Sequence, residues 1–111
     1  MTGLTKDARL LLVGAVAQDS NRFCFTGSVL REGKQFVSLC LELDVASAGR
    51  TIREAKRMLA EAVSLYLEVC FENNLPHLRP VPREEDPRLN PKIELVEIFP
   101  LKVDFKVHAV A

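Results

Sequence analysis

The sequence has few cysteines, and their arrangement excludes two classes of protein. The three cysteines, Cys24, Cys40 and Cys70, are an odd number, lie far apart and have apolar neighbours. They therefore form neither the disulfide framework of a small secreted domain nor a CxxC metal site. We interpret them as plain buried thiols and expect a cytoplasmic protein.

The sequence also has no net charge, no long apolar run and no visible internal repeat. Its 15 Lys and Arg balance 15 Asp and Glu, whereas proteins that wrap DNA or coat an anionic membrane depend on an excess of cations. The apolar run from Leu10 to Ala17 is too short to span a bilayer and lacks a clear cleavage site after a basic region. We therefore expect neither DNA nor a membrane as the partner.

What the sequence contains is typical of one globular domain. Apolar residues make up 48% of the chain and charged residues 27%, a composition too apolar for a disordered protein. We divide the chain into an N-terminal arm at residues 1–21 and one domain at residues 22–111. The arm has no regular period and is compatible with a helix, a strand or a docking arm.

Residues 22–43 alternate in the manner of a β-hairpin. The first alternating run consists of Phe23, Phe25, Gly27 and Val29, and apolar side chains again occupy every second position from Val37 to Leu43. Gly33 lies between the two runs and can supply the positive φ that a tight connection needs. We expect residues 44–50 to form a short loop after the hairpin.

The clearest helix start in the chain is at Thr51. Thr51 and Glu54 have the capping-box spacing, in which the hydroxyl caps a first-turn N–H and the carboxylate accepts from the N–H of the cap residue. Asn73 and Asn74, followed by Pro76, favour an end shortly after Phe71. The apolar stripe that we expect to face the core consists of Ile52, Ala55, Leu59, Ala62, Tyr66 and Val69.

The region after the helix begins with a proline-rich segment, Pro76 to Pro91, which contains five prolines. Proline at this density favours an extended surface loop. Residues 93–98 and the alternating run at 101–109 are β-like, and we expect Phe99 and Pro100 to separate them. The sequence therefore predicts an α+β fold, a small antiparallel sheet with one long helix packed on one face, in the order ββ-α-ββ with room for an extra N-terminal element.

The region from Arg31 to Glu68 resembles the HicB-like antitoxin family. The resemblance covers about a third of the chain. It depends on a glycine turn, an apolar site in the following loop, a helix-opening motif and a second element in the helix. The matching residues are Gly33 for the turn, Leu43 for the loop, Gly49, Thr51, Glu54 and Ala55 for the helix opening, and Glu61 and Ala62 for the second element.

The resemblance implies a small α+β domain whose antiparallel sheet is covered on one face by the helix. It also implies a binding role without catalysis, because such proteins neutralise a small RNA-cutting toxin by covering its site. Many members carry a C-terminal DNA-binding motif, but after Pro91 this sequence has only strands and no second helix pair. We keep open whether the chain has a cognate toxin or is a solitary homologue.

The basic residues at the start of the helix are the candidate site for an acidic partner, a phosphate or RNA. Cations at a helix N-terminus oppose the macrodipole, and a broken local rule can mark a functional surface. The structural alternative is a solvated face that contains an ordinary i,i+4 pair between Arg57 and Glu61. The candidate residues are Arg50, Arg53, Lys56 and Arg57.

No catalytic constellation is visible in the sequence. Gly49, Thr51 and Glu54 need only a structural role in the helix cap, and no nucleophile and base stand together. His77 and His108 have no partners at metal-ligand spacing, so we expect no metal and no other cofactor. The sequence predicts a protein that is not an enzyme.

Two rival functions remain open beside toxin or RNA binding. A remnant metal-dependent nuclease would use the carboxylates of Asp44, Glu54 and Glu61. A structural scaffold would assemble from several copies of the chain. One helix leaves a face of a small sheet bare, and the last strand could add a strand from another chain, so we expect a homo-oligomer, with a docked N-terminal segment as the alternative cover for that face.

Overall fold

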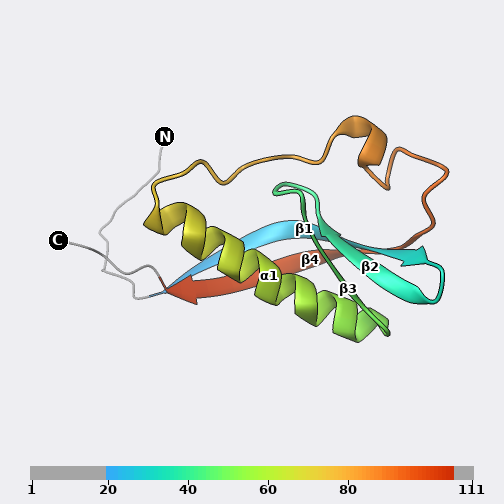
Figure 1. Ribbon diagram of the computed structural model, residues 1–111, viewed down its shortest axis with the longest axis horizontal. Helices are drawn as coiled ribbons and strands as arrows, with labels where there is room; N and C mark the ends of the chain where they lie inside the picture. The colour runs from blue at the N-terminus through green and yellow to red at the C-terminus, as the bar shows by residue number, and fades with distance from the viewer. Residues whose placement is uncertain (1–19, 107–111) are drawn as a thin grey trace.

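The computed structural model of the protein describes residues 20–106 (Figure 1). Most of the arm at residues 1–21, the end of the predicted last strand at residues 107–109 and His108 lie outside the described residues. Residues 20 and 21 already belong to the first strand. The elements in chain order are β1 (Ser20–Glu32), β2 (Gln35–Cys40), β3 (Val45–Gly49), α1 (Ile52–Glu72), the short 3-10 helix η2 (Arg83–Glu85) and β4 (Leu95–Lys106).

The four strands form one antiparallel sheet in the order β3-β2-β1-β4. Helix α1 lies across one face of this sheet (Figure 1). The turn between β1 and β2 contains Gly33 at a φ of 63°, a value that glycine adopts at little cost. The predicted α+β fold, with a small antiparallel sheet and one long helix, is confirmed.

The predicted loop at residues 44–50 is wrong, because most of it forms β3. The chain turns at Leu41 to Asp44, with Asp44 at a φ of 53°, and β3 then pairs with β2 from Val45 opposite Cys40 to Gly49 opposite Phe36. The sequence of β3 is short and consists of small residues, so it shows no alternation of apolar and polar side chains. Pairing with β2 therefore decides its conformation.

The prediction that Phe99 and Pro100 separate two strands is also wrong, because β4 is continuous. Pro100 lies opposite Thr26 of β1. The backbone of Thr26 bonds on its other side: its N–H donates to Glu42 Oε1 at 2.8 Å, and its C=O accepts from the Leu41 N–H at 3.0 Å. Pro100 therefore needs no N–H toward β1 and fits an edge strand. The order is βββ-α-β instead of ββ-α-ββ.

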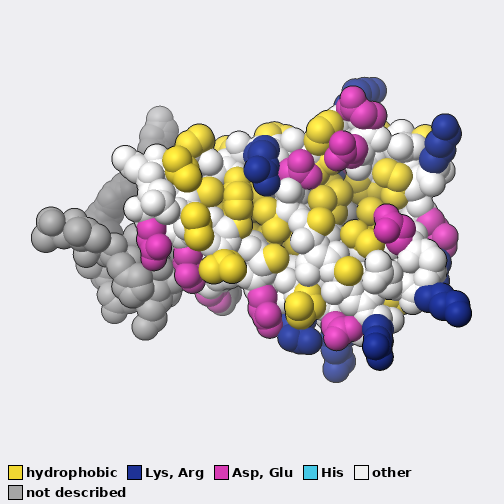
Figure 2. All heavy atoms as spheres, in the orientation of Figure 1, with side chains coloured by type: hydrophobic (Ala, Val, Ile, Leu, Met, Phe, Trp, Pro, Cys, Tyr) yellow, Lys and Arg dark blue, Asp and Glu magenta, His cyan; other side chains and the backbone are white. Residues whose placement is uncertain are grey.

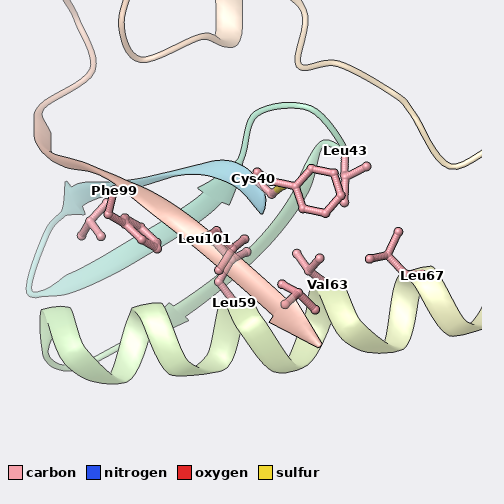
Figure 3. Packing of buried hydrophobic residues seen from close by; sticks show 10 residues of the cluster. Cys40, Leu43, Leu59, Val63, Leu67, Phe99 and Leu101 are labelled. Atoms are coloured by element: carbon pink, nitrogen blue, oxygen red, sulfur yellow. The ribbon is translucent and has the colours of Figure 1, made fainter. Parts of the chain in front are cut away.

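The core lies between α1 and the sheet (Figure 3). The second half of the predicted helix stripe is shifted by one residue: after Leu59, the fully buried positions are Val63 and Leu67 instead of Ala62 and Tyr66. Each fully buried Leu or Val contributes about 1.5–3 kcal/mol. The buried cluster comprises Phe25, Val29, Cys40, Leu43, Leu59, Val63, Leu67, Phe99, Leu101 and Val103.

The face of the sheet opposite α1, here called the outer face, is also apolar. Ser38 marks the helix side, because its hydroxyl donates to Ala55 O at 2.7 Å, so its neighbour Leu39 points to the outer face. Leu30 and Leu39 on this face are nearly buried, whereas Leu95 and Ile98 are 36% and 42% exposed. The outer face therefore presents apolar side chains beside the edge strand β4.

The proline-rich segment starts beside the C-terminal half of α1 and then runs along the side of the sheet away from α1 (Figure 1). It is irregular except for η2, and it is fastened to the rest of the molecule. The N–H groups of Arg79 and Val81 donate to Glu42 O and Leu41 O at 3.0 and 2.9 Å. The Tyr66 hydroxyl donates to His77 O at 2.8 Å.

Candidate functional site

The start of α1 is held by a set of backbone contacts. Thr51 Oγ1 accepts from the Glu54 N–H at 3.0 Å, and Glu54 Oε1 accepts from the Arg50 N–H at 2.7 Å. The sequence predicted that the Glu54 carboxylate would accept from the N–H of the cap residue Thr51. It accepts instead from the N–H of Arg50, one residue earlier. A Cβ on Gly49 would lie 2.6 Å from Ala55 N, so only glycine allows this close approach. These residues have a structural role.

Two of the four predicted cations are engaged within the fold. Lys56 Nζ forms an ion pair with Glu97 of β4 and lies 4.8 Å from the centre of the Phe99 ring. Arg57 pairs with Glu61 at 3.1 Å, the i,i+4 contact expected of a solvated face. Lys56 and Arg57 therefore belong mainly to the structure of the domain.

The other two predicted cations, Arg50 and Arg53, remain available. Both are exposed, and among residues 20–106 neither side chain has an ion-pair partner. They flank the cap at the positive end of the helix macrodipole, which favours an anionic ligand. Figure 2 shows basic side chains along the lower right border, at the N-terminal end of α1.

The three carboxylates of the nuclease alternative do not come together. Asp44 precedes β3 and Glu54 follows it. The five extended residues of β3, with a rise of about 3.3 Å per residue, therefore separate the two carboxylates. Glu54 serves the helix cap and Glu61 pairs with Arg57. Within the part of the chain that the structure describes, no three His, Cys, Asp or Glu side chains could hold a metal ion. The geometry does not favour this alternative.

The cysteines differ from one another in their surroundings. Cys40 and Cys70 are buried, as predicted, whereas Cys24 is exposed. Burial, together with the negative charge of Glu42, raises the pKa of the Cys40 thiol to about 11. Cys40 therefore stays protonated at neutral pH and is a poor nucleophile.

The sequence reasoning missed the most prominent surface feature, the exposed apolar residues along α1 and β4. Leu65 and Val69 of α1 are 63% and 46% exposed, and Val96 of β4 is 38% exposed. Val69 had been assigned to the core stripe. The signal in the sequence is that apolar residues of this helix exceed one stripe, but which of them stay outside depends on how the helix sits on the sheet.

The comparisons with known proteins give no relative. No protein-family model, no curated protein and no solved structure matches this chain. Within residues 20–106, no helix is both long and apolar enough to cross a membrane.

Proposed function

We propose that this chain is a non-catalytic binding protein of the HicB-like antitoxin type, whose partner is a small RNA-cutting toxin. The observation that carries the proposal is the edge of β4. Among the described residues β4 pairs with β1 alone, and Leu65 and Ile98 expose apolar surface on its two sides. An unpaired strand edge beside exposed apolar side chains is typical of a surface that binds another chain.

The nature of the partner follows from the resemblance at residues 31–68. The turn at Gly33 and the cap at Thr51, on which that resemblance depends, both have defined roles in the fold. The absence of disulfides among Cys24, Cys40 and Cys70 supports action in the cytoplasm, where thiols stay reduced.

Co-expression with a small basic protein encoded beside this chain tests the proposal. We expect the two proteins to co-purify and the RNA-cutting activity of the neighbour to be lost in the complex. A neighbour that remains active and unbound in the presence of excess folded antitoxin would contradict the proposal.

Arg50 and Arg53 support RNA as a second ligand. Replacing both with Glu should weaken binding of a labelled RNA and flatten its dependence on salt, because binding with fewer phosphate contacts releases fewer counterions. Arg83→Glu is the matched control, since Arg83 is exposed and lies in the proline-rich segment. Equal losses in both variants, or no loss in either, would assign the two arginines to a solvated face.

A homo-oligomeric scaffold is the second candidate, and a hollow on the outer face favours it. This hollow of about 340 Å³ lies over the paired strands β1 and β4 and includes Cys24, Ile98 and Pro100 in its lining. A second copy could fill it with an apolar side chain. Light scattering of the wild type and of Ile98→Glu over a range of concentrations tests this: an oligomer that dissociates only in the variant supports the scaffold.

A further inference from the structure

A groove of about 350 Å³ runs between α1 and the edge strand β4. Its α1 wall contains Ala60, Leu65 and Glu68, and its β4 wall contains Lys102 and Val103. The two elements run in the same direction here, because Lys56 contacts Glu97 and the later helix residues line the groove with the later residues of β4. Figure 1 shows α1 crossing β4 at an angle, with both elements running from right to left.

The β4 wall of the groove offers backbone hydrogen bonds. Thr26 bonds away from β4, so its opposite residue Pro100 directs its own backbone away from β1. Because this direction alternates along a strand, the N–H and C=O of Lys102 also point to the outer edge of β4. An extended segment could therefore pair with β4 beyond the proline.

The α1 wall has an apolar centre between two acids. Leu65 is 63% exposed, with Glu61 one turn before it and Glu68 one turn after it. Glu61 already pairs with Arg57, and no ion pair of Glu68 occurs within residues 20–106. Figure 2 shows acidic side chains along the lower left border, over the C-terminal half of α1.

The spacing of these three side chains fits one face of an extended strand. At a rise of about 1.5 Å per residue, Glu61 and Glu68 lie about 6 and 4.5 Å along the helix axis from Leu65. Alternate residues of a strand are about 6.7 Å apart, and long Lys or Arg side chains can absorb the difference. A segment with basic, apolar and basic residues at alternate positions therefore complements the groove in shape and charge.

We propose that the groove between α1 and β4 binds an extended, basic segment of the partner protein, which adds to the edge of β4 as a strand. Its central apolar side chain packs on Leu65, and its flanking cations approach Glu61 and Glu68. Strand addition of this kind combines backbone bonds with side-chain pockets. The inference rests on the proposed function only for the identity of the partner. Binding of a synthetic peptide to the groove can be measured whether or not the proposed function is correct.

The test is a titration of the full chain with a fluorescein-labelled peptide, Ser-Ser-Lys-Ser-Leu-Ser-Lys-Ser-Ser, followed by fluorescence anisotropy. A peptide with Glu in place of Lys is the ligand control. We expect Leu65→Lys and Glu68→Lys each to weaken binding by roughly tenfold. Leu78→Lys is the matched control and should bind normally, because Leu78 is as exposed as Leu65, 63%, but lies in the proline-rich segment.

Four outcomes would overturn the inference. The first is a wild type that fails to bind the basic peptide, and the second is equal binding of this peptide by the Leu65 and Leu78 variants. The third is a wild-type oligomer that Leu65→Lys dissociates, because a second copy of the chain would then occupy the groove. The fourth is a toxin that binds the wild type and Leu65→Lys equally, which contradicts the groove as the binding site but leaves the proposed function intact. Peptide binding without toxin binding supports the groove and contradicts the proposed function.

Discussion

Single carboxylates connect segments that are distant in the sequence. Glu42 accepts from both the N–H and the hydroxyl of Thr26, each at 2.8 Å. Its own backbone oxygen accepts from Arg79 of the proline-rich segment. Glu42 thus joins β1, the turn after β2 and the proline-rich segment at one point.

Replacing Glu42 with Gln tests this connection. One oxygen becomes an amide donor, and the remaining bond to Thr26 loses its charge, so we expect the free energy of unfolding to fall by about 1–3 kcal/mol. Urea denaturation followed by circular dichroism measures the change. Glu32→Gln, at an exposed position near the β1–β2 turn, should stay within about 0.5 kcal/mol of the wild type; equal effects would refute the role of Glu42.

Asp86 has a similar role inside the proline-rich segment. It is 6% exposed, and its carboxylate accepts from the side chain of Arg88 at 2.8 and 3.1 Å and from its N–H at 2.9 Å. These bonds with Arg88 lower the pKa of Asp86 below its ordinary value of 3.8. The carboxylate is therefore bound more tightly in the folded protein than the protonated acid.

The pH dependence of stability follows from the lowered pKa of Asp86. The contribution of Asp86 is fully present above pH 3.8, the ordinary value, and is lost as the pH falls through the lower folded-state pKa. Asp86→Asn should cost about 1–3 kcal/mol at pH 7 and less at about pH 3, below the ordinary pKa of 3.8. Urea titrations at both pH values measure this, with the exposed Glu85→Gln as control; a constant difference would contradict it.

At the scale of elements, the local pattern predicts the type of an element better than its limits. The capping residues and the asparagines identify α1 almost to the residue, because caps act within one turn. The limits of the strands depend on their neighbours: β3 exists because β2 pairs with it, and β4 continues through Pro100 because it lies at an edge. The predicted apolar stripe of α1 was correct up to Leu59 and shifted by one residue after it, because the sheet also decides which helix residues are buried.

Pro100 also protects the middle of the β4 edge. The residue faces away from β1, so its replacement by Ala should change the free energy of unfolding by less than about 1 kcal/mol while adding an outward N–H. We expect Pro100→Ala to associate with itself more strongly than the wild type in concentration-dependent light scattering. Pro91→Ala is the control outside the sheet, and a Pro100→Ala protein that fails to fold would show that the proline shapes β4 itself.

At the scale of the whole molecule, one layer of helix covers one face of the sheet and the proline-rich segment runs along the other (Figure 1). The last strand completes both the sheet and the core, since Phe99, Leu101 and Val103 are buried in β4. Within residues 20–106, the surfaces to which we assign partners in our proposals are the arginines at the start of α1 and the exposed apolar residues on both sides of the β4 edge.

Deleting residues 92–111 should therefore abolish the fold. The truncated chain loses three core side chains and the ladder with β1, a loss comparable with the whole 5–15 kcal/mol by which a domain is typically stable. Circular dichroism and the loss of a cooperative thermal transition measure this. Leu101→Ala, expected to cost about 2–5 kcal/mol, is the milder variant, and Lys102→Ala is its exposed neighbour. A folded truncation product would show that the sheet is complete without β4.

The sequence by itself determined the features that depend on local chemistry: the helix start at Thr51, the turn at Gly33, the alternation of β1 and the α+β class. Only the tertiary structure decided which cations are engaged, because the partners of Lys56 on β4 are about forty positions away in the chain. It likewise decided that Leu65 lies outside and Val63 inside. Both are apolar helix residues, and their difference arises from the side on which the sheet packs.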